Sequence, residues 1–364
     1  MKLDVVEEFI KLASLNSPSR QEGQVAAYLL GRLREMGLCP VGDDSAPLSG
    51  SDTGNIVVRI PGNADGPAIL LCAHMDTVGP TEGMTPVVRD GVIYSNGETV
   101  LGADDKAGIA IILTAVSELL EEGGPHGPLE LLFTVQEEIG LFGAKFLQTE
   151  LKADFGYIAD GDGPVGNIVT SSPSKIDLDF TIAGKAAHAA RPELGINAIS
   201  VAAAAVARLQ SGRIDADTTM NIGLISGGKA RNIVPENASV AIEIRGFNGE
   251  KLEEEVQKTI AVFNEEAAAV GAGVKIRREL NFETFHIPET HPVVVNAVRA
   301  AVAVGIEPLF RKSGGGMDAN VFNGRGLPCI GLGFGAEKMH SPEEFVPISQ
   351  LRDGARFIKS LIIK

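Results

Sequence analysis

The chain has 364 residues, 44% of them hydrophobic, and its 47 acidic side chains outnumber 32 lysines and arginines to give a formal net charge of −15. Nucleic acids and anionic membranes select basic surfaces, so this charge argues against both as partners. Single hydrophobic cores stop growing near about 250–300 residues, and we therefore expect two domains.

The cysteines indicate a reducing environment. Cys39, Cys72 and Cys329 are the only three, they are scattered, and no CxxC pair occurs. A disulfide framework is therefore not expected, and we predict a cytoplasmic protein. The first helix carries acidic residues and lacks the apolar core of a signal peptide, and no apolar run reaches membrane-spanning length.

The first part of the chain alternates between helical and strand patterns. Helices are predicted over 3–15, 22–37 and 103–123, and strands over 55–60, 68–78, 129–138 and 153–161. A hairpin is expected over 86–97, with Asp90-Gly91 as its turn. This alternation predicts an α/β domain with a mostly parallel central sheet.

A second domain is predicted where the pattern changes. From about residue 173 the order is strand, helix, strand, strand, helix, strand, which is the ferredoxin-like α+β arrangement. The α/β pattern resumes after about residue 289 and continues to the end. We therefore predict one domain made of residues 1–172 and 289–364, interrupted by an inserted domain of residues 173–288.

A histidine and an aspartate end the apolar strand of residues 68–78. His74 and Asp76 are two positions apart, so their side chains leave the same face of a strand. They lie at its carboxyl end, where open α/β sheets place ligands. The pair suits a metal-binding histidine beside an orienting carboxylate, although a lone histidine here would more often be a core residue.

Adjacent acids occur at two further positions. Asp104-Asp105 lies in a glycine-flanked turn before a helix, where a single aspartate is usually only a cap. Glu137-Glu138 ends an apolar strand, and such acids are costly to bury unless they are paired or bound to a cation. Glu137-Glu138 therefore favours a functional role over a structural one, even without the other motifs.

Two more residues complete the candidate set. Asp160 ends the next strand, and His340 lies in a polar loop near the end of the chain. Each is unremarkable alone, but the combined nitrogen and oxygen donors suit zinc, cobalt or manganese. Two such ions about 3.5–4 Å apart polarise a carbonyl and generate hydroxide near neutral pH.

Four motifs carry a resemblance to a known family: AHMDTV at 73–78, GADDKAG at 102–108, QEEIGLFGA at 136–144 and HSPEEF at 340–345. In this order and spacing the chain resembles the metallopeptidases that include peptidase T, carboxypeptidase G, succinyl-diaminopimelate desuccinylase and acetylornithine deacetylase. The resemblance covers essentially the whole chain. It implies a zinc-peptidase catalytic domain and an inserted lid domain, through which a homodimer is expected.

The resemblance also implies a set of ligands for two divalent metal ions, with zinc expected and cobalt or manganese possible. One aspartate would bridge both ions, one histidine and one further aspartate would complete the first site, and a glutamate and a second histidine would complete the second. In that order these residues are Asp104, His74, Asp160, Glu138 and His340.

Two further carboxylates receive roles from the resemblance. Glu137 would be the general base that activates the bridging water and passes its proton to the leaving amine. Asp76 would orient His74. The family also implies a cis peptide bond after the bridging residue, here Asp104-Asp105.

The predicted lid contains three candidate residues. Family members place a histidine that stabilises the oxyanion from a partner subunit at the position of His188, which Ala189-Ala190 follows here instead of proline-glycine. Asn232 matches a segment near the substrate. Arg245 could bind a substrate carboxylate, and it could equally be a solvated strand residue.

The sequence leaves the substrate open. Residues 312–318 read KSGGGMD, where peptidase T has Arg-Gly-Gly-Thr-Asp, so strict tripeptide specificity does not follow. The favoured function is an aminopeptidase acting on short peptides. The alternatives are a deacylase or carboxypeptidase that uses the same metals on N-acyl amino acids, and a non-catalytic binding protein with the inherited fold.

Overall fold

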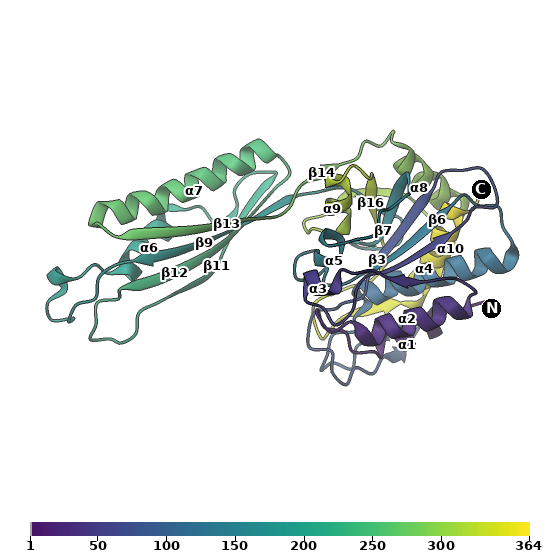
Figure 1. The fold of residues 1–364 in the computed structure, drawn as a ribbon, viewed down its shortest axis with the longest axis horizontal. Coiled ribbons are helices and arrows are strands. Elements are labelled where there is room, and N and C mark those ends of the chain that lie inside the picture. The colour runs from purple at the N-terminus through teal and green to yellow at the C-terminus, as the bar shows by residue number, and fades with distance from the viewer. Residues whose placement is uncertain (1) are drawn as a thin grey trace. The chain divides into compact units, whose positions relative to one another are not determined.

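The computed structural model describes residues 2–364, which form two compact units (Figure 1). The first unit comprises the chain up to Ser171 together with His286–Lys364, and the second is Ser172–Phe285. The second unit covers nearly the segment that the sequence predicts as an insertion, and each unit is described by itself below.

The first unit is built on a mixed nine-stranded sheet in the order β1-β2-β6-β3-β7-β16-β8-β14, with β15 also paired to β8. Its centre is parallel, because β3 runs parallel to β6 and β7, and β7 parallel to β16. β2 and β8 are antiparallel to their neighbours β6 and β16. The strands are β1 (Val41–Gly42), β2 (Ile56–Ile60), β3 (Ile69–His74), β6 (Leu129–Thr134), β7 (Phe155–Gly161), β8 (Asn167–Ser172), β14 (Phe285–His286), β15 (Leu309–Lys312) and β16 (Cys329–Gly333). The predicted α/β class is confirmed, with its parallel strands at the centre of the sheet.

Apolar runs explain why these strands and helices pack together. Every residue of β3 and β6 is buried, as expected for strands covered on both faces. Helix α4 is buried along most of its circumference, so it is a central helix, and it packs against β3, β7, α1 and α10. The helices of this unit are α1 (Val5–Ala13), α2 (Gly23–Glu35), α3 (Ala46–Ser49), α4 (Ala103–Glu122), α5 (Phe142–Lys145), α8 (Pro292–Ala303), α9 (Asp318–Gly324) and α10 (Ile348–Ile362).

A small three-stranded sheet joins distant segments of the first unit. β4 (Val87–Arg89) and β5 (Val92–Tyr94) form the predicted hairpin, with positive φ at Asp90 and Gly91. β17 (Phe345–Pro347) pairs with β5. The segment just before β17, which contains His340, is thereby attached to the region that precedes α4.

The second unit has the ferredoxin-like arrangement that the sequence predicts. Its antiparallel sheet has the order β10-β11-β12-β9-β13, and α6 and α7 pack against it. It has its own core, in which the rings of Phe180 and Phe263 stack with centroids 3.8 Å apart. The elements are β9 (Ser174–Ala183), the 3-10 helix η1 (Pro192–Leu194), α6 (Ala198–Arg208), β10 (Gly212–Arg213), β11 (Thr218–Gly227), β12 (Asn237–Gly246), α7 (Gly249–Val270) and β13 (Gly273–Phe282).

No helix among the described residues is both long and apolar enough to span a membrane.

Candidate metal centre

The carboxyl ends of three adjacent strands bring the predicted ligands of the first unit together. His74 is the last residue of β3, Asp160 lies at the end of β7, and Glu137 and Glu138 follow β6. Because β3 is parallel to both β6 and β7, these ends meet at one edge of the sheet. Asp104 reaches the same edge from the first turn of α4.

Asp104 lies between the two histidines. Its Oδ1 is 3.1 Å from Nε2 of His74, and its Oδ2 is 3.1 Å from Nε2 of His340. His74 Nε2 is also 3.8 Å from Asp160 Oδ1, whereas His340 Nε2 is 3.1 Å from Glu138 Oε1. One carboxylate thus presents one oxygen to each of two groups of side chains.

Glu137 lies beside the first of these groups. Ligand atoms of Glu137, His74 and Asp160 lie within 4.8 Å of one another, and so do those of His74, Asp104 and Glu138. Glu137 is buried, and burial raises its pKa well above the usual carboxyl range. The neighbouring negative charges of Glu138, Asp318 and Asp76 raise this pKa further.

The electrostatics of the centre are those of a site that needs a cation. Burial raises the pKa of Asp160 well above its usual value, and the neighbouring Asp104 raises it further. Burial alone would lower the pKa of His74, but hydrogen bonds to Asp104 and Asp76 outweigh it and raise that pKa. Hydrogen bonds to Asp104 and Glu138 raise the pKa of His340 to about 10. So many acids in one buried place are costly without positive charge, and histidine with carboxylates is a donor set that fits zinc, cobalt or manganese.

Asp76 contacts two parts of the centre. His74 Nδ1 is 2.8 Å from the backbone oxygen of Asp76 and 3.4 Å from its Oδ1, so the main chain makes the shorter contact with the ring. The carboxylate of Asp76 accepts hydrogen bonds from the backbone N–H groups of Glu137, at 2.9 Å, and Glu138, at 3.3 Å. The hydroxyl of Ser19 donates to it as well, at 2.7 Å. Asp76 therefore holds the turn that carries both glutamates.

The second unit brings His188 and Asn232 together. Their loops form an isolated antiparallel bridge between His188 and Ile233, and the N–H of Ala189 donates to the backbone oxygen of Asn232 at 3.0 Å. Nδ1 of His188 accepts from the N–H of Ala190 at 3.0 Å. In the neutral ring the proton is then on Nε2, which makes the exposed side of His188 a hydrogen-bond donor.

Arg245 lies at the opposite end of the same sheet. It pairs in register with Lys175 near the start of β9, and its Nε donates to Glu243 at 2.7 Å. Asn237, where β12 begins, lies next to the loop that carries Asn232. The residues from Asn237 to Arg245 span about 26 Å at about 3.3 Å per residue. Arg245 is therefore separated from His188 and Asn232 within one unit.

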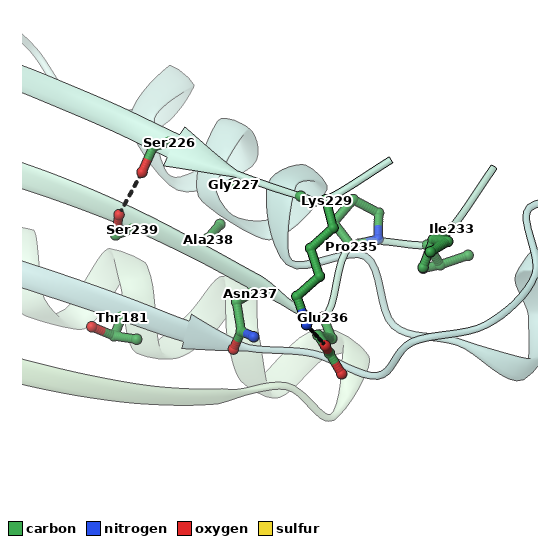
Figure 2. A pocket seen from close by; sticks show the side chains of 12 residues that line it. Thr181, Ser226, Gly227, Lys229, Ile233, Pro235, Glu236, Asn237, Ala238 and Ser239 are labelled. Atoms are coloured by element: carbon green, nitrogen blue, oxygen red, sulfur yellow. Dashed lines mark hydrogen bonds and ion pairs between the residues drawn. The ribbon is translucent and has the colours of Figure 1, made fainter. Parts of the chain in front are cut away.

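A hollow of about 520 Å³ lies beside the Asn232 loop (Figure 2). In its lining, Ser226 and Ser239 share a hydrogen bond, and Lys229 forms an ion pair with Glu236. None of the lining residues is a predicted metal ligand. The one lysine and the one glutamate of the lining pair with each other at 2.6 Å.

Comparison with known proteins identifies the family. The chain matches the family described as "Peptidase family M20/M25/M40" over residues 70–364. The chain belongs to this peptidase family. Its predicted resemblance to the metallopeptidases of the peptidase T group is thereby confirmed, and so is the two-part peptidase fold.

Three relatives align with this chain over almost its whole length. The solved structure of aminopeptidase PepT from Bacillus cereus ATCC 10987 is 37% identical with a TM-score of 0.91, and covers 98% of this chain and 97% of its own. A tripeptidase from Staphylococcus aureus subsp. aureus mu50 is 35% identical with a TM-score of 0.95, and covers 98% and 96%. Peptidase T of Geobacillus kaustophilus (strain HTA426) is 28% identical, over 100% of this chain and 98% of its own.

Sequence reasoning missed one supporting residue of the candidate metal centre, Asp105. The peptide bond between Asp104 and Asp105 is cis, as the resemblance implies. Asp105 is fully buried and accepts hydrogen bonds from the N–H groups of His74 and Gly108, at 3.2 and 3.1 Å. A Cβ at Gly108 would lie 2.2 Å from Asp105 Oδ1 and 2.5 Å from the oxygen of Ala159, so glycine is required there. The two adjacent aspartates in the sequence indicated a special position. Only the structure shows that Asp104 faces the histidines while Asp105 supports the backbone.

Proposed function

We propose that the chain is a di-metal aminopeptidase that releases the N-terminal residue of short peptides. The observation that carries this proposal is the position of Asp104, whose two carboxylate oxygens each lie 3.1 Å from a different histidine. Relatives called aminopeptidase and tripeptidase, both above one third identity over nearly the whole chain, support the choice of substrate.

Each metal ion would have three ligands from the chain. His74, Asp104 and Asp160 would hold the first, and Asp104, Glu138 and His340 the second. When bound, the two ions supply Lewis-acid polarisation of the scissile carbonyl and lower the pKa of water. Zinc is the first expectation for these nitrogen and oxygen donors, with cobalt and manganese next.

Glu137 would be the general base. It lies beside the first ligand group, and the hydrogen bond from its N–H to Asp76 fixes the turn that carries it. In this position its carboxylate takes a proton from the attacking water and returns it to the departing amine. Asp76 is then a positioning residue for Glu137 as well as for His74.

We further propose that the second unit acts as a lid that forms a two-fold homodimer. Arg245 and the His188–Asn232 pair lie too far apart for one short peptide to touch both ends of one lid. The outer edge of strand β11 could dock a second copy. β10 covers this edge at Thr219 and Met220, and beyond them the side chains of Leu224 and Ile225 are 72% and 54% exposed. His188 and Asn232 would then complete the site of the other subunit, with the Nε2 proton of His188 directed to the oxyanion.

A cytoplasmic location is part of the proposal. Cys39, Cys72 and Cys329 are all free thiols, and such thiols persist in a reducing compartment.

A substrate comparison tests the activity. The protein, loaded in turn with zinc, cobalt and manganese, is assayed on free dipeptides and tripeptides, on the same peptides with a blocked amine, and on N-acyl amino acids. We expect hydrolysis of the free peptides and its loss on blocking, because an acidic site attracts the substrate ammonium group. Faster hydrolysis of N-acyl amino acids than of free peptides would instead assign the chain to the deacylases.

A further inference from the structure

Glu344 joins two segments of the metal centre. Its side chain is 1% exposed and lies among residues of the first unit. Its Oε2 accepts a hydrogen bond from the N–H of Gly102 at 2.8 Å, and its Oε1 accepts one from the N–H of Asp104 at 3.1 Å. Both carboxylate oxygens are thus used on the turn that carries the proposed bridging ligand.

The Asp104 turn needs such an acceptor. Gly102 has a left-handed φ of 69°, and the backbone angles of Asp104 and Asp105 are not helical although α4 has already begun. The first N–H groups of a helix have no acceptor inside the helix. The side chain of Glu344 supplies one from a segment that lies 240 positions away from Asp104.

The main chain of Glu344 is fixed independently of this contact. Its N–H donates to the oxygen of Ser341, its oxygen accepts from the N–H of Ser95, and both distances are 3.1 Å. Strand β17 begins at the next residue and pairs with β5. The side chain therefore extends from a rigid point, and the same anchored segment carries His340.

We propose that Glu344 is a positioning residue that fixes the Asp104 turn against the His340 segment. It thereby sets the position of Asp104, the ligand that both metal ions would share. The inference rests on the proposed di-metal function. It predicts that loosening Glu344 weakens both metal sites together, because Asp104 belongs to both. A change that acts on His340 alone would weaken one site.

The adjacent residue offers a matched control. Glu343 has the same side chain, but it is exposed, and its carboxylate forms an ion pair with the nearby Lys338. Glu344→Gln keeps the size of the side chain, yet an amide has one acceptor oxygen, so its NH₂ group would face one of the two backbone N–H donors. Glu343→Gln removes the same charge without touching the turn.

The test measures metal affinity directly. Wild type, E344Q and E343Q are stripped with a chelator, checked for folding by circular dichroism, and titrated with zinc and cobalt under equilibrium dialysis. We expect E344Q to lose about 10–100-fold in affinity at both sites, the range for residues that support metal ligands, and E343Q to match wild type. Peptide hydrolysis by E344Q should recover as the metal concentration is raised. Because bound metal also stabilises the folded state, E344Q must be as fully folded as wild type by circular dichroism before metal is added for this recovery to count as a gain of metal binding.

The outcomes separate the role of Glu344 from the existence of the metal centre that it supports. E344Q with wild-type affinity at both sites refutes the role of Glu344, and so does an equal loss in E343Q. Wild-type protein that binds fewer than two ions refutes the di-metal centre itself, and the proposed role of Glu344 with it. If E344Q does not fold, E344D replaces it. The shorter carboxylate cannot reach both N–H groups, so unchanged affinities in E344D would also overturn the proposal.

Discussion

Removal of the metal ions should destabilise one unit of the molecule and leave the other unchanged. Groups of three or more metal-ligating side chains among residues 2–364 occur only in the first unit. A ligand that binds only the folded state, present at 100 times its dissociation constant, stabilises that state by about 2.7 kcal/mol. Two such sites would contribute about 5 kcal/mol to the first unit.

The corresponding shift in melting temperature follows from the size of the unit. The first unit has about 250 residues, so its unfolding entropy is about 0.5 kcal/mol/K at about 2.1 cal/mol/K per residue. A stabilisation of about 5 kcal/mol then corresponds to about 10 °C. The second unit has a separate hydrophobic core and no such ligand group among the residues described, so its transition should stay in place.

Differential scanning calorimetry of the chelated and metal-loaded protein measures both transitions. A fragment of residues 172–285 run under the same conditions identifies the transition of the second unit. An unchanged melting temperature of the first unit would refute the placement of the ions at its strand ends. A metal-dependent shift confined to the second unit would refute it too.

Four further outcomes are expected. The metal-free protein should lose stability as pH rises from about 4 to about 7, because the raised pKa values of its buried acids make the folded state hold protons that the unfolded state releases. Above this range the raised pKa of His340, about 10, and the lowered pKa of Lys106, about 7, act in opposite directions. Urea melts from about pH 4 to about pH 7 measure the effect, and rising stability would contradict it. Asp104→Ala should bind neither metal by elemental analysis, and two retained ions would exclude its bridging role. Glu137→Gln should keep both ions yet lose about 10²–10⁴-fold in turnover, whereas Glu138→Gln should lose metal; the reverse pattern would exchange the two roles. His188→Ala should lose about 10²–10³-fold in turnover. Mixing this variant with Glu137→Gln should restore activity in exchanged heterodimers, and inactive heterodimers would place His188 outside the partner's site.

Local patterns were sufficient to predict most of the strand-end residues. His74, Glu137, Glu138 and Asp160 follow apolar runs, and parallel strands bring their carboxyl ends to one edge by geometry alone. His340 could not be placed in this way, because its contact with Asp104 spans 236 positions and depends on the pairing of β17 with β5. From the residues alone, His340 was an unremarkable member of the candidate donor set, and only the family resemblance gave it a place at the second metal ion.

The second unit shows the same limit of local reasoning. The order of its strands and helices was predictable, since the hydrophobic periodicity changes clearly at each element. The pairing of His188 with Ile233 was not, because it joins two loops through backbone hydrogen bonds that leave no mark in composition. The separation of Arg245 from these loops likewise follows only from the register of β9 with β12.

The central claim is that the centre at the ends of β3, β6 and β7 hydrolyses peptides with two ions. The most direct measurement titrates zinc into chelated protein and follows both bound metal and the hydrolysis of a free tripeptide. The account predicts no hydrolysis without metal and full activity when two ions are bound per chain. Full activity in the chelated protein, or hydrolysis that does not change as the two sites fill, would contradict it.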